Sequence, residues 1–337
     1  MEVRIMKIGV IGLGIMGKPM VKNLLKAKNT VFVNDVNKDT EQEMEKEGAQ
    51  AVSINIIAQE ADYLILSLPN GAIVKSVLYS GEDSVMNQKE VKVKGVIDTS
   101  SLTPNESLEI SKVLEKQKIK YIDAPVSGGE PLAITGELSI MVGCNEYDLE
   151  EIKKVCEPIA KSIIRVGDVG AGSVVKLANQ IIVNTNIAAL SEAVVLSKKF
   201  DIDLESMHQA IKGGLAGSSV MEAKFPKMIA EDYQPGGTLN INLKDLKNVS
   251  STADTVGLTL PLSNQVKEIY KSEVAQGNGL NDHSGVIKFF EKINNKDVFF
   301  EEIVLPRNMM KTSLENLTLK NVTFPKEEFI NKTFVLY

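Results

Sequence analysis

The chain has 337 residues, of which 43% are hydrophobic and 24% are charged, and its formal net charge is −6. A single hydrophobic core usually stops growing near about 250–300 residues, so this length predicts two domains. The acidic balance argues against a nucleic-acid-binding protein, because such proteins carry a basic patch or stripe. It does not exclude an anionic small molecule, since a binding site needs only a few local cations.

Thiols and imidazoles are rare, and they are Cys144, Cys156, His208 and His283. Two thiols are too few for a disulfide framework, so a reducing, cytoplasmic setting is expected. Neither histidine has a metal-ligand spacing, so no metal site is predicted. All four residues are interpreted as structural.

The first half of the chain alternates short apolar runs with helical patterns. Strands are expected at residues 5–11, 30–34, 63–68, 95–98 and 121–123, followed by later strands at 138–142 and 163–166. Helices are expected between them, at residues 18–27, 38–47, 72–78 and 106–117. Strands that are apolar on both faces and alternate with helices predict an α/β domain with a parallel sheet covered on both sides.

The second half is predicted to be all helical. Helices are expected at residues 173–200, 203–212, 218–228, 242–255, 260–276 and 283–293. The first of these is apolar around most of its circumference, which predicts burial between elements or at a subunit interface. Asn184, Asn186 and Glu192 interrupt it, so a buried helix is predicted and no membrane span. The predicted divisions are residues 1–167, residues 168–294 and an extension of unknown role at 295–337.

A G-x-G-x-x-G sequence follows the first expected strand and opens a helix; it consists of Gly12, Leu13, Gly14, Ile15, Met16 and Gly17. Gly12 allows a tight turn, Gly14 lets the backbone approach a pyrophosphate, and Gly17 allows close helix–strand packing. The pyrophosphate would lie at the helix N-terminus, where free N–H groups point at the anion. This context predicts a dinucleotide-binding domain of the Rossmann type.

Asn34 and Asp35 end the second expected strand. A carboxylate at this position accepts hydrogen bonds from a ribose hydroxyl and repels a 2′-phosphate. No arginine follows it, and the nearest cation is Lys38, so NAD(H) is favoured and NADP(H) stays possible. The alternative is that Asp35 is a turn residue.

Two further strand ends should line the same site, because open parallel sheets bind ligands at the carboxyl ends of their strands. The residues expected there are Leu68, Pro69, Asn70 and Thr99. Taken alone, each segment is equally typical of a turn or a helix cap.

Three segments carry candidate chemistry. Ser127, Gly128 and Gly129 follow a strand, and such a loop exposes successive N–H groups and a hydroxyl that suit a carboxylate, although an ordinary glycine turn explains it as well. Lys176, Asn179 and Gln180 share one helical face, where a lysine in apolar surroundings needs partners. A second helical lysine is Lys244.

Together these segments resemble the β-hydroxyacid dehydrogenase family over about residues 7–293. The residues that carry the resemblance are GLGIMGKPM (12–20), DAPVSGGE (123–130), GAGSVVKLANQ (170–180) and KDL (244–246). The resemblance implies a 6-phosphogluconate dehydrogenase-like fold and a homo-oligomer, a dimer or tetramer. It implies that Lys176 is the general acid in reduction and the general base in reverse. It also implies that Ser127, Gly128 and Gly129 hold a carboxylate, that Asn179 or Gln180 orients the substrate, and that Lys244 closes the site near the nicotinamide or the substrate carboxylate.

Within the family, residues 129–143, 176–193 and 213–226 resemble the branch of tartronate semialdehyde (2-hydroxy-3-oxopropionate) reductases. This implies NAD(P)H-dependent reduction of tartronate semialdehyde to glycerate. Glyoxylate, succinic semialdehyde, methylmalonate semialdehyde and 3-hydroxyisobutyrate remain alternatives, because all pair a carboxylate with a carbonyl or hydroxyl group. A different class is a dinucleotide-binding module without catalysis, and the presence of Lys176 argues against it.

Overall fold

The computed structural model describes residues 5–294. The chain up to Ile287 forms one compact unit, and the chain is divided from the next unit at Lys288. Everything below concerns the first unit, which contains every predicted site residue; its last helix, α13 (Ile287–Asn294), continues into the second. The predicted extension at 295–337 lies outside the described residues, and the predicted division at residue 167 stays a prediction.

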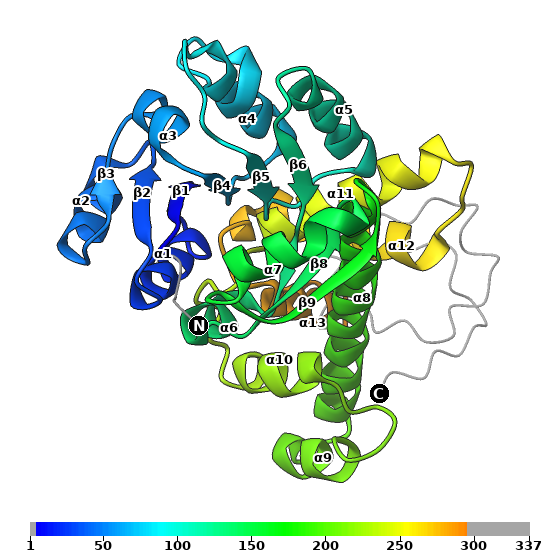
Figure 1. The fold of residues 1–337 in the computed structure, drawn as a ribbon. Helices are drawn as coiled ribbons and strands as arrows, with labels where there is room; N and C mark the ends of the chain where they lie inside the picture. Colours follow the sequence, from blue (N-terminus) through cyan, green and yellow to red (C-terminus); the bar gives the residue numbers. More distant parts are fainter. Residues whose placement is uncertain (1–4, 295–337) are drawn as a thin grey trace, which may run out of the picture. The chain divides into compact units, whose positions relative to one another are not determined.

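One mixed sheet organises the first half of the chain (Figure 1). Its strands are β1 (Lys7–Ile11), β2 (Thr30–Asn34), β3 (Gln50–Ala51), β4 (Tyr63–Leu66), β5 (Gly95–Asp98), β6 (Lys120–Asp123), β7 (Val126–Ser127), β8 (Leu138–Gly143) and β9 (Ala160–Gly167). The order is β3-β2-β1-β4-β5-β6-β8-β7, with β9 paired to β8. The first six strands are all parallel, which confirms the predicted parallel sheet.

The later strands depart from parallel pairing. β8 runs antiparallel to both β6 and β7, and β9 is parallel to β8. The reversal follows from a short connection: α6 (Gly129–Thr135) separates β7 from β8 and ends at Gly136, whose φ of 73° turns the chain back. A parallel return would need a crossover of about a dozen residues or more.

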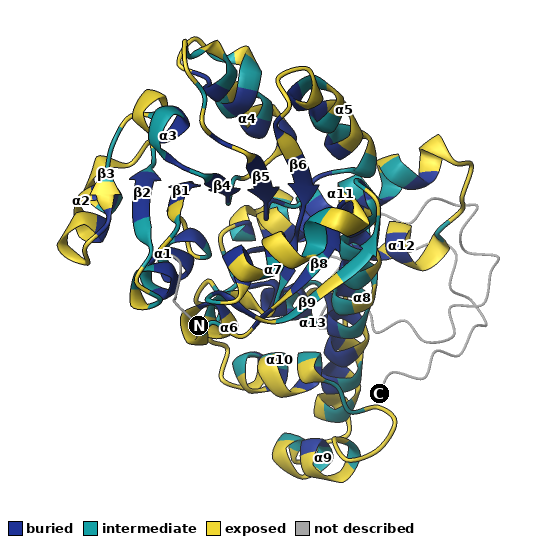
Figure 2. Cartoon of the chain, viewed as in Figure 1, coloured by how far each residue is buried: buried dark blue, intermediate teal, exposed yellow. Residues whose placement is uncertain are grey.

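Helices cover both faces of the sheet. They are α1 (Gly17–Lys26), α2 (Lys38–Lys46), α3 (Ile54–Glu60), α4 (Gly71–Lys75), α5 (Pro104–Glu115), α6 and α7 (Leu149–Cys156). Neighbouring residues of β4 belong to opposite cores, Ile65 to one and Leu64 and Leu66 to the other. Figure 2 shows the buried central strands between helices whose outer faces are exposed. The sheet is therefore covered on both sides, as the apolar strands predict.

The second half of this unit is helical, as predicted. Its α-helices are α8 (Ala171–Lys199), α9 (Leu204–Ile211), α10 (Ser219–Ile229), α11 (Leu239–Thr255) and α12 (Pro261–Glu273), and a 3-10 turn, η5 (His283–Val286), precedes α13. By length and hydropathy, α8 is the one helix in the described part of the chain that could cross a membrane. It packs against β8, β9, α10, α11 and α12 (Figure 1), and Asn184 and Ser191 are buried in it. We interpret α8 as the core helix of this half.

Candidate active site

The strand order reverses between β1 and β4, which lie side by side although β2 and β3 separate them in the chain. In open α/β sheets, ligands bind outside the carboxyl ends of the strands at such a point of reversal. The predicted glycine loop, the second strand end and the loops after β4 and β5 all lie at this edge.

The glycine loop presents backbone to open space. Gly12 has a φ of 97°, and a Cβ there would strike the carbonyl group of Ser67. A Cβ on Gly17 would strike the carbonyl oxygen of Gly12, whereas a Cβ on Gly14 would meet no protein atom within 4 Å. No side chain caps α1. A close turn, an open approach at Gly14 and an uncapped helix start fit a pyrophosphate.

The other loop residues divide between core and surface. Leu13 is buried in the core beneath the sheet edge, Met16 is partly buried, and Ile15 is exposed. The Leu13 N–H donates to Oδ2 of Asp35 over 2.6 Å. The second strand end thus anchors the loop that follows the first.

Two carboxylates, Asp35 and Glu41, lie just after β2. Asp35 also accepts from the Asn37 N–H over 2.8 Å. Oε1 of Glu41 accepts from the Asp35 N–H and from Lys38, each over 2.9 Å. Beside them lies an open cavity of about 550 Å³, lined by Asn34, Lys38, Glu41, Ala51, Val52, Ser53, Ile54, Asn55 and Asp83. Its volume is in the range of small-molecule and cofactor sites.

The residues expected at the next two strand ends lie where predicted, but their polar side chains are engaged within the protein. Asn70 caps α4 by accepting from the Ile73 N–H. Thr99 Oγ1 donates to the carbonyl oxygen of Leu66 over 2.6 Å. The Leu68 N–H donates to Ser100 Oγ over 2.9 Å, and Pro69 has no N–H to offer a ligand. A cofactor role for these four residues therefore stays a prediction.

The helix that carries the predicted catalytic lysine, α8, begins next to the end of β6. Oδ1 of Asp123, at the end of β6, accepts from the Gly170 N–H over 2.8 Å, and Oδ2 accepts from the Ser173 N–H over 2.7 Å. Burial raises the pKa of Asp123 to about 6, against the opposing effect of these two N–H groups. The carboxylate therefore fixes the start of the helix that carries Lys176.

Lys176 lies against the predicted carboxylate loop. Its Nζ donates to the carbonyl oxygen of Val126 over 2.8 Å, one residue before Ser127. Protein surrounds most of the side chain, although the residue keeps some accessible surface. Burial lowers the pKa of Lys176; Asp245 opposes this effect and Lys244 adds to it. A lysine whose pKa is lowered is more often neutral than an ordinary lysine and so serves more readily as both a proton donor and a proton acceptor.

The two amides after Lys176 have different partners. Asn179 lies toward the loop, with Ser127 Oγ 3.5 Å from its Oδ1. Gln180 is buried and donates to Oδ2 of Asp245 over 2.6 Å. Gln180 Oε1 also accepts from the Asn179 amide over 3.0 Å. The two amides therefore have different surroundings, and the role of each stays a prediction.

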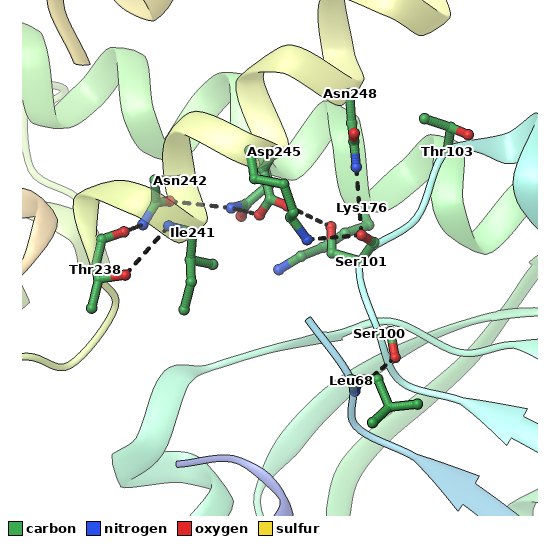
Figure 3. Close-up of polar contacts among 12 residues, drawn as sticks. Leu68, Ser100, Ser101, Thr103, Lys176, Thr238, Ile241, Asn242, Asp245 and Asn248 are labelled. Carbon is green, nitrogen blue, oxygen red and sulfur yellow. Dashed lines mark hydrogen bonds and ion pairs between the residues drawn. The ribbon is translucent and has the colours of Figure 1, made fainter. Parts of the chain in front are cut away.

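Asp245, from the KDL segment, contacts Gln180, Ser101 and Lys244 at once. It was absent from the predicted site residues. Its buried carboxylate accepts from Gln180, and its Oδ1 accepts from Ser101 Oγ over 2.8 Å and lies 3.0 Å from Lys244 Nζ. Lys244 also donates to the Ser101 carbonyl oxygen over 2.9 Å. Figure 3 shows Asp245 on α11 facing Ser101 in the loop after β5, with Lys176 beside them. The KDL motif was the signal that could have identified Asp245.

The turn at Gly128 and Gly129 depends on glycine. Their φ values are 130° and 66°, which other residues rarely adopt. Both glycines are exposed, next to the half-buried Ser127. The turn can therefore offer N–H groups and a hydroxyl to an anion beside Lys176.

Two family models match the chain. The NAD-binding domain of 6-phosphogluconate dehydrogenase matches residues 7–167, and the NAD-binding domain of NADP-dependent 3-hydroxyisobutyrate dehydrogenase matches residues 170–290. The chain is 37% identical to 2-(hydroxymethyl)glutarate dehydrogenase of Eubacterium barkeri, over 87% of this chain and 97% of the relative. It is 34% identical to 2-hydroxy-3-oxopropionate reductase of Escherichia coli (strain K12), over 86% and 99%.

The crystal structure of 3-hydroxyisobutyrate dehydrogenase from Salmonella typhimurium has a TM-score of 0.76 to this chain at 30% identity. The match covers 85% of this chain and all of that one. These matches span nearly the whole length of the relatives. The chain belongs to the β-hydroxyacid dehydrogenase family and is an NAD(P)-dependent hydroxyacid dehydrogenase.

Proposed function

We propose that this enzyme interconverts an aldehyde acid of the form OHC–CHR–COO⁻ and its alcohol HOCH₂–CHR–COO⁻, with tartronate semialdehyde and glycerate as the first pair to test. The observation that carries the proposal is the contact of Lys176 with the segment that leads into Ser127, Gly128 and Gly129. It puts a proton donor beside a turn suited to a carboxylate. Three relatives named above act on compounds with this common frame, in which R is a hydroxyl, a methyl or a carboxyethyl group.

The chain's own groups would divide the work of reduction as follows. The turn at Gly128 and Gly129 binds the carboxylate through its N–H groups, and Ser127 adds its hydroxyl. Lys176, as the ammonium ion, donates a proton to the oxygen of the former carbonyl group, which is typically worth about 10²–10⁴ in rate. The bound nicotinamide supplies the hydride. In the reverse direction neutral Lys176 accepts the proton from the alcohol.

The network around Lys176 supports this assignment. Asp245 stabilises the ammonium form, since its charge raises the pKa of Lys176 against burial. Gln180 and Ser101 both donate to Asp245, so α8, α11 and the loop after β5 are held in one arrangement. Asn179, which faces Ser127, is the better placed of the two amides to orient a substrate.

For the cofactor, we propose a preference for NAD(H) over NADP(H). Asp35 and Glu41 place two carboxylates at the adenosine end, where a 2′-phosphate would bring further negative charge. Lys38, the cation there, is already paired with Glu41 at 2.9 Å. Charge repulsion at this end favours a ribose with free hydroxyl groups.

The test is NADH oxidation with tartronate semialdehyde, glyoxylate, succinic semialdehyde and methylmalonate semialdehyde, using wild type and Lys176→Met. Kcat is expected to fall at least about 10²-fold in the variant, while the Kd for NADH, measured by fluorescence, stays within about twofold. Lys247→Met, an exposed lysine of α11, is the matched control. Faster turnover of an acid outside the OHC–CHR–COO⁻ frame would contradict the substrate class. Full activity of Lys176→Met would contradict the acid, and NADH binding without turnover of any acid would favour a non-catalytic module.

We also propose a homo-oligomer without nucleic-acid or membrane partners, in the cytoplasm. Ile182, Leu196 and Phe200, on α8 or at its end, are each more than half exposed, at 61%, 61% and 72%. Exposed apolar side chains along one helix are typical of a subunit interface. Sedimentation of the full chain tests this, since a monomer at micromolar concentration would contradict it.

A further inference from the structure

Asp98 is a buried carboxylate at the carboxyl edge of the sheet, outside the group of side chains that meet around Lys176. It is the last residue of β5 and is 1% exposed. Its Oδ1 accepts from the Ser100 N–H over 2.9 Å, and its Oδ2 accepts from the Tyr121 hydroxyl over 2.8 Å. Both donors are neutral, and a buried carboxylate is costly unless its partners compensate for the loss of water. Stability alone therefore does not explain an ionisable residue at this position.

Tyr121, on β6, is the side-chain partner of this carboxylate and is itself 4% exposed. Burial, and after it the charge of Asp98, raises the pKa of Tyr121, so the hydroxyl keeps its proton and acts as a donor. Burial also raises the pKa of Asp98, and Ser100, Tyr121 and the charge of Lys244 oppose this effect. The two buried side chains thus form a fixed point at the start of the loop after β5.

The loop after β5 connects this pair to the proposed reaction site. Ser100 Oγ accepts from a backbone N–H of the loop after β4 over 2.9 Å. The next residue, Ser101, donates its hydroxyl to Asp245 Oδ1 over 2.8 Å, and its carbonyl oxygen accepts from Lys244 over 2.9 Å. Figure 3 shows Ser100 and Ser101 in this loop, with Ser101 facing α11. Asp98 therefore fixes one residue of the loop, and the next residue fixes Lys244 and Asp245.

The two charges that the loop holds act on Lys176. Asp245 raises the pKa of Lys176 and Lys244 lowers it, and the effect of Asp245 is the larger of the two. His283 also lies within reach of the Lys176 charge, but it is neutral at pH 7, because burial lowers its pKa to about 3. Release of the loop would leave Asp245 less firmly held, and the pKa of Lys176 would then fall.

We propose that Asp98 and Tyr121 are positioning residues for the reaction. They hold the loop after β5 in the conformation in which Ser101 keeps Asp245 beside Lys176. The inference rests on the proposed function, in which Lys176 is the acid. Both residues are buried, so they act through Ser101 and Asp245 and not by contact with the substrate.

The first test is reduction of tartronate semialdehyde by Tyr121→Phe, which removes one hydroxyl and keeps the ring. Kcat at neutral pH should fall about threefold to tenfold, as for the loss of one hydrogen bond, and the decrease of the rate with rising pH should begin at lower pH. Asp98→Leu should have at least the same effect, whereas Asp98→Asn keeps an oxygen for the Ser100 N–H and should retain more activity. Tyr270→Phe is the matched control, because Tyr270 is also buried and its hydroxyl has no partner among the described residues.

A double-mutant cycle separates positioning from a general loss of structure. In the Asp245→Asn background, Tyr121→Phe should lower kcat by less than about twofold, because the side chain through which it acts has already lost its charge. An equal fall of kcat in both backgrounds would overturn the proposal. So would an unchanged kcat in both Tyr121→Phe and Asp98→Leu.

Should no aldehyde acid react, the proposed function fails, and the positioning is tested by NMR of the NADH complex with isotope-labelled lysine. The signal of Lys176 is assigned by its absence in Lys176→Met. A Lys176 pKa that is lower in Tyr121→Phe than in wild type would support the proposal, and equal pKa values in the two proteins would overturn it.

Discussion

The two halves of the proposed active site are built by different means. At the proposed cofactor end, the glycine loop depends on its backbone and on the lack of side chains. The chain packs closely at Gly12 and Gly17, and the space beside Gly14 is open. At the reaction end, side chains from segments far apart in the chain meet around Lys176 and Asp245. The first half is local in sequence, and the second exists only once α8, α11 and the sheet have packed.

This difference has a consequence for substitution. A change in the glycine loop should impair cofactor binding and leave the chemical step intact. A change in the Asp245 network should slow the chemical step and leave cofactor binding intact. Mutants that mix the two effects would show that the halves are coupled.

The largest effect is expected at Gly14. A Cβ there meets no protein atom within 4 Å, so Gly14→Val should fold normally but occupy the space proposed for the pyrophosphate. The Kd for NADH should rise up to about 100-fold, as for overpacking that costs about 1–3 kcal/mol, with kcat at saturating NADH nearly unchanged. Gly213→Val, at an equally open position, is the control. Unaltered NADH affinity in Gly14→Val would remove this loop from the cofactor site.

The next effect concerns the pH dependence of stability that arises from Asp123, the residue that fixes the start of α8. The pKa of Asp123 is raised from 3.8 to about 6 by burial, so the folded chain binds this proton more tightly than the unfolded chain. Stability from this group is fully present below about pH 3.8 and is lost as the pH rises through about 6. In Asp123→Asn this loss should disappear. The free energy of unfolding, measured with urea, should then fall between these two pH values by less than in wild type, and the difference should be on the order of 1–3 kcal/mol. Asp232→Asn, in an exposed turn, should keep the wild-type slope, and the same slope in Asp123→Asn would refute the assignment.

How much the sequence predicted also differs between the two halves. Apolar runs identified β1, β2, β4, β5 and β6, and glycine spacing identified the loop at Gly12. Each of these signals lies within a few neighbouring residues. Short elements were missed: α3 and α6 have seven residues each and α7 has eight, which is about two turns and too few to show a clear period. The predicted helix at 283–293 is in fact a 3-10 turn, η5, followed by α13.

The reaction half could be predicted only in part. Lys176, Asn179 and Gln180 were recognisable as one helical face, and Lys244 as part of a motif. The importance of Asp245 depends on its contacts with Ser101 and Gln180, which are distant in the sequence and which helical periodicity cannot reveal. The antiparallel pairing of β8 with β6 was missed for the same reason.

A third prediction tests the network itself. Asp245→Asn keeps the shape but removes the charge that raises the pKa of Lys176, so this pKa should fall further. Reduction requires the ammonium form; its rate therefore decreases as the pH rises through the Lys176 pKa, and in the variant this decrease should begin at lower pH. Kcat at neutral pH should drop about tenfold, as for the loss of a charge–charge interaction that favours the ammonium form of Lys176 by about 1.4 kcal/mol, with the Kd for NADH unchanged. Asp254→Asn, exposed on the same helix, is the control, and an unshifted pH profile for Asp245→Asn would separate Asp245 from the acid.

The smallest effect is expected at the adenosine end, where side-chain charge supplements the backbone. Glu41→Gln keeps an oxygen for the Asp35 N–H but frees Lys38 from its ion pair. Lys38 is well exposed, with 67% of its side chain accessible, so solvent screens its charge, and we expect an effect of the size measured for surface charges, about 0.2–1 kcal/mol. The ratio of the NADPH and NADH dissociation constants should therefore fall only about two- to fivefold, measured beside Glu45→Gln, an exposed change on the same helix. A ratio unchanged by Glu41→Gln would leave Asp35 as the sole source of the preference, and the cofactor half would then depend on one carboxylate and its glycine loop.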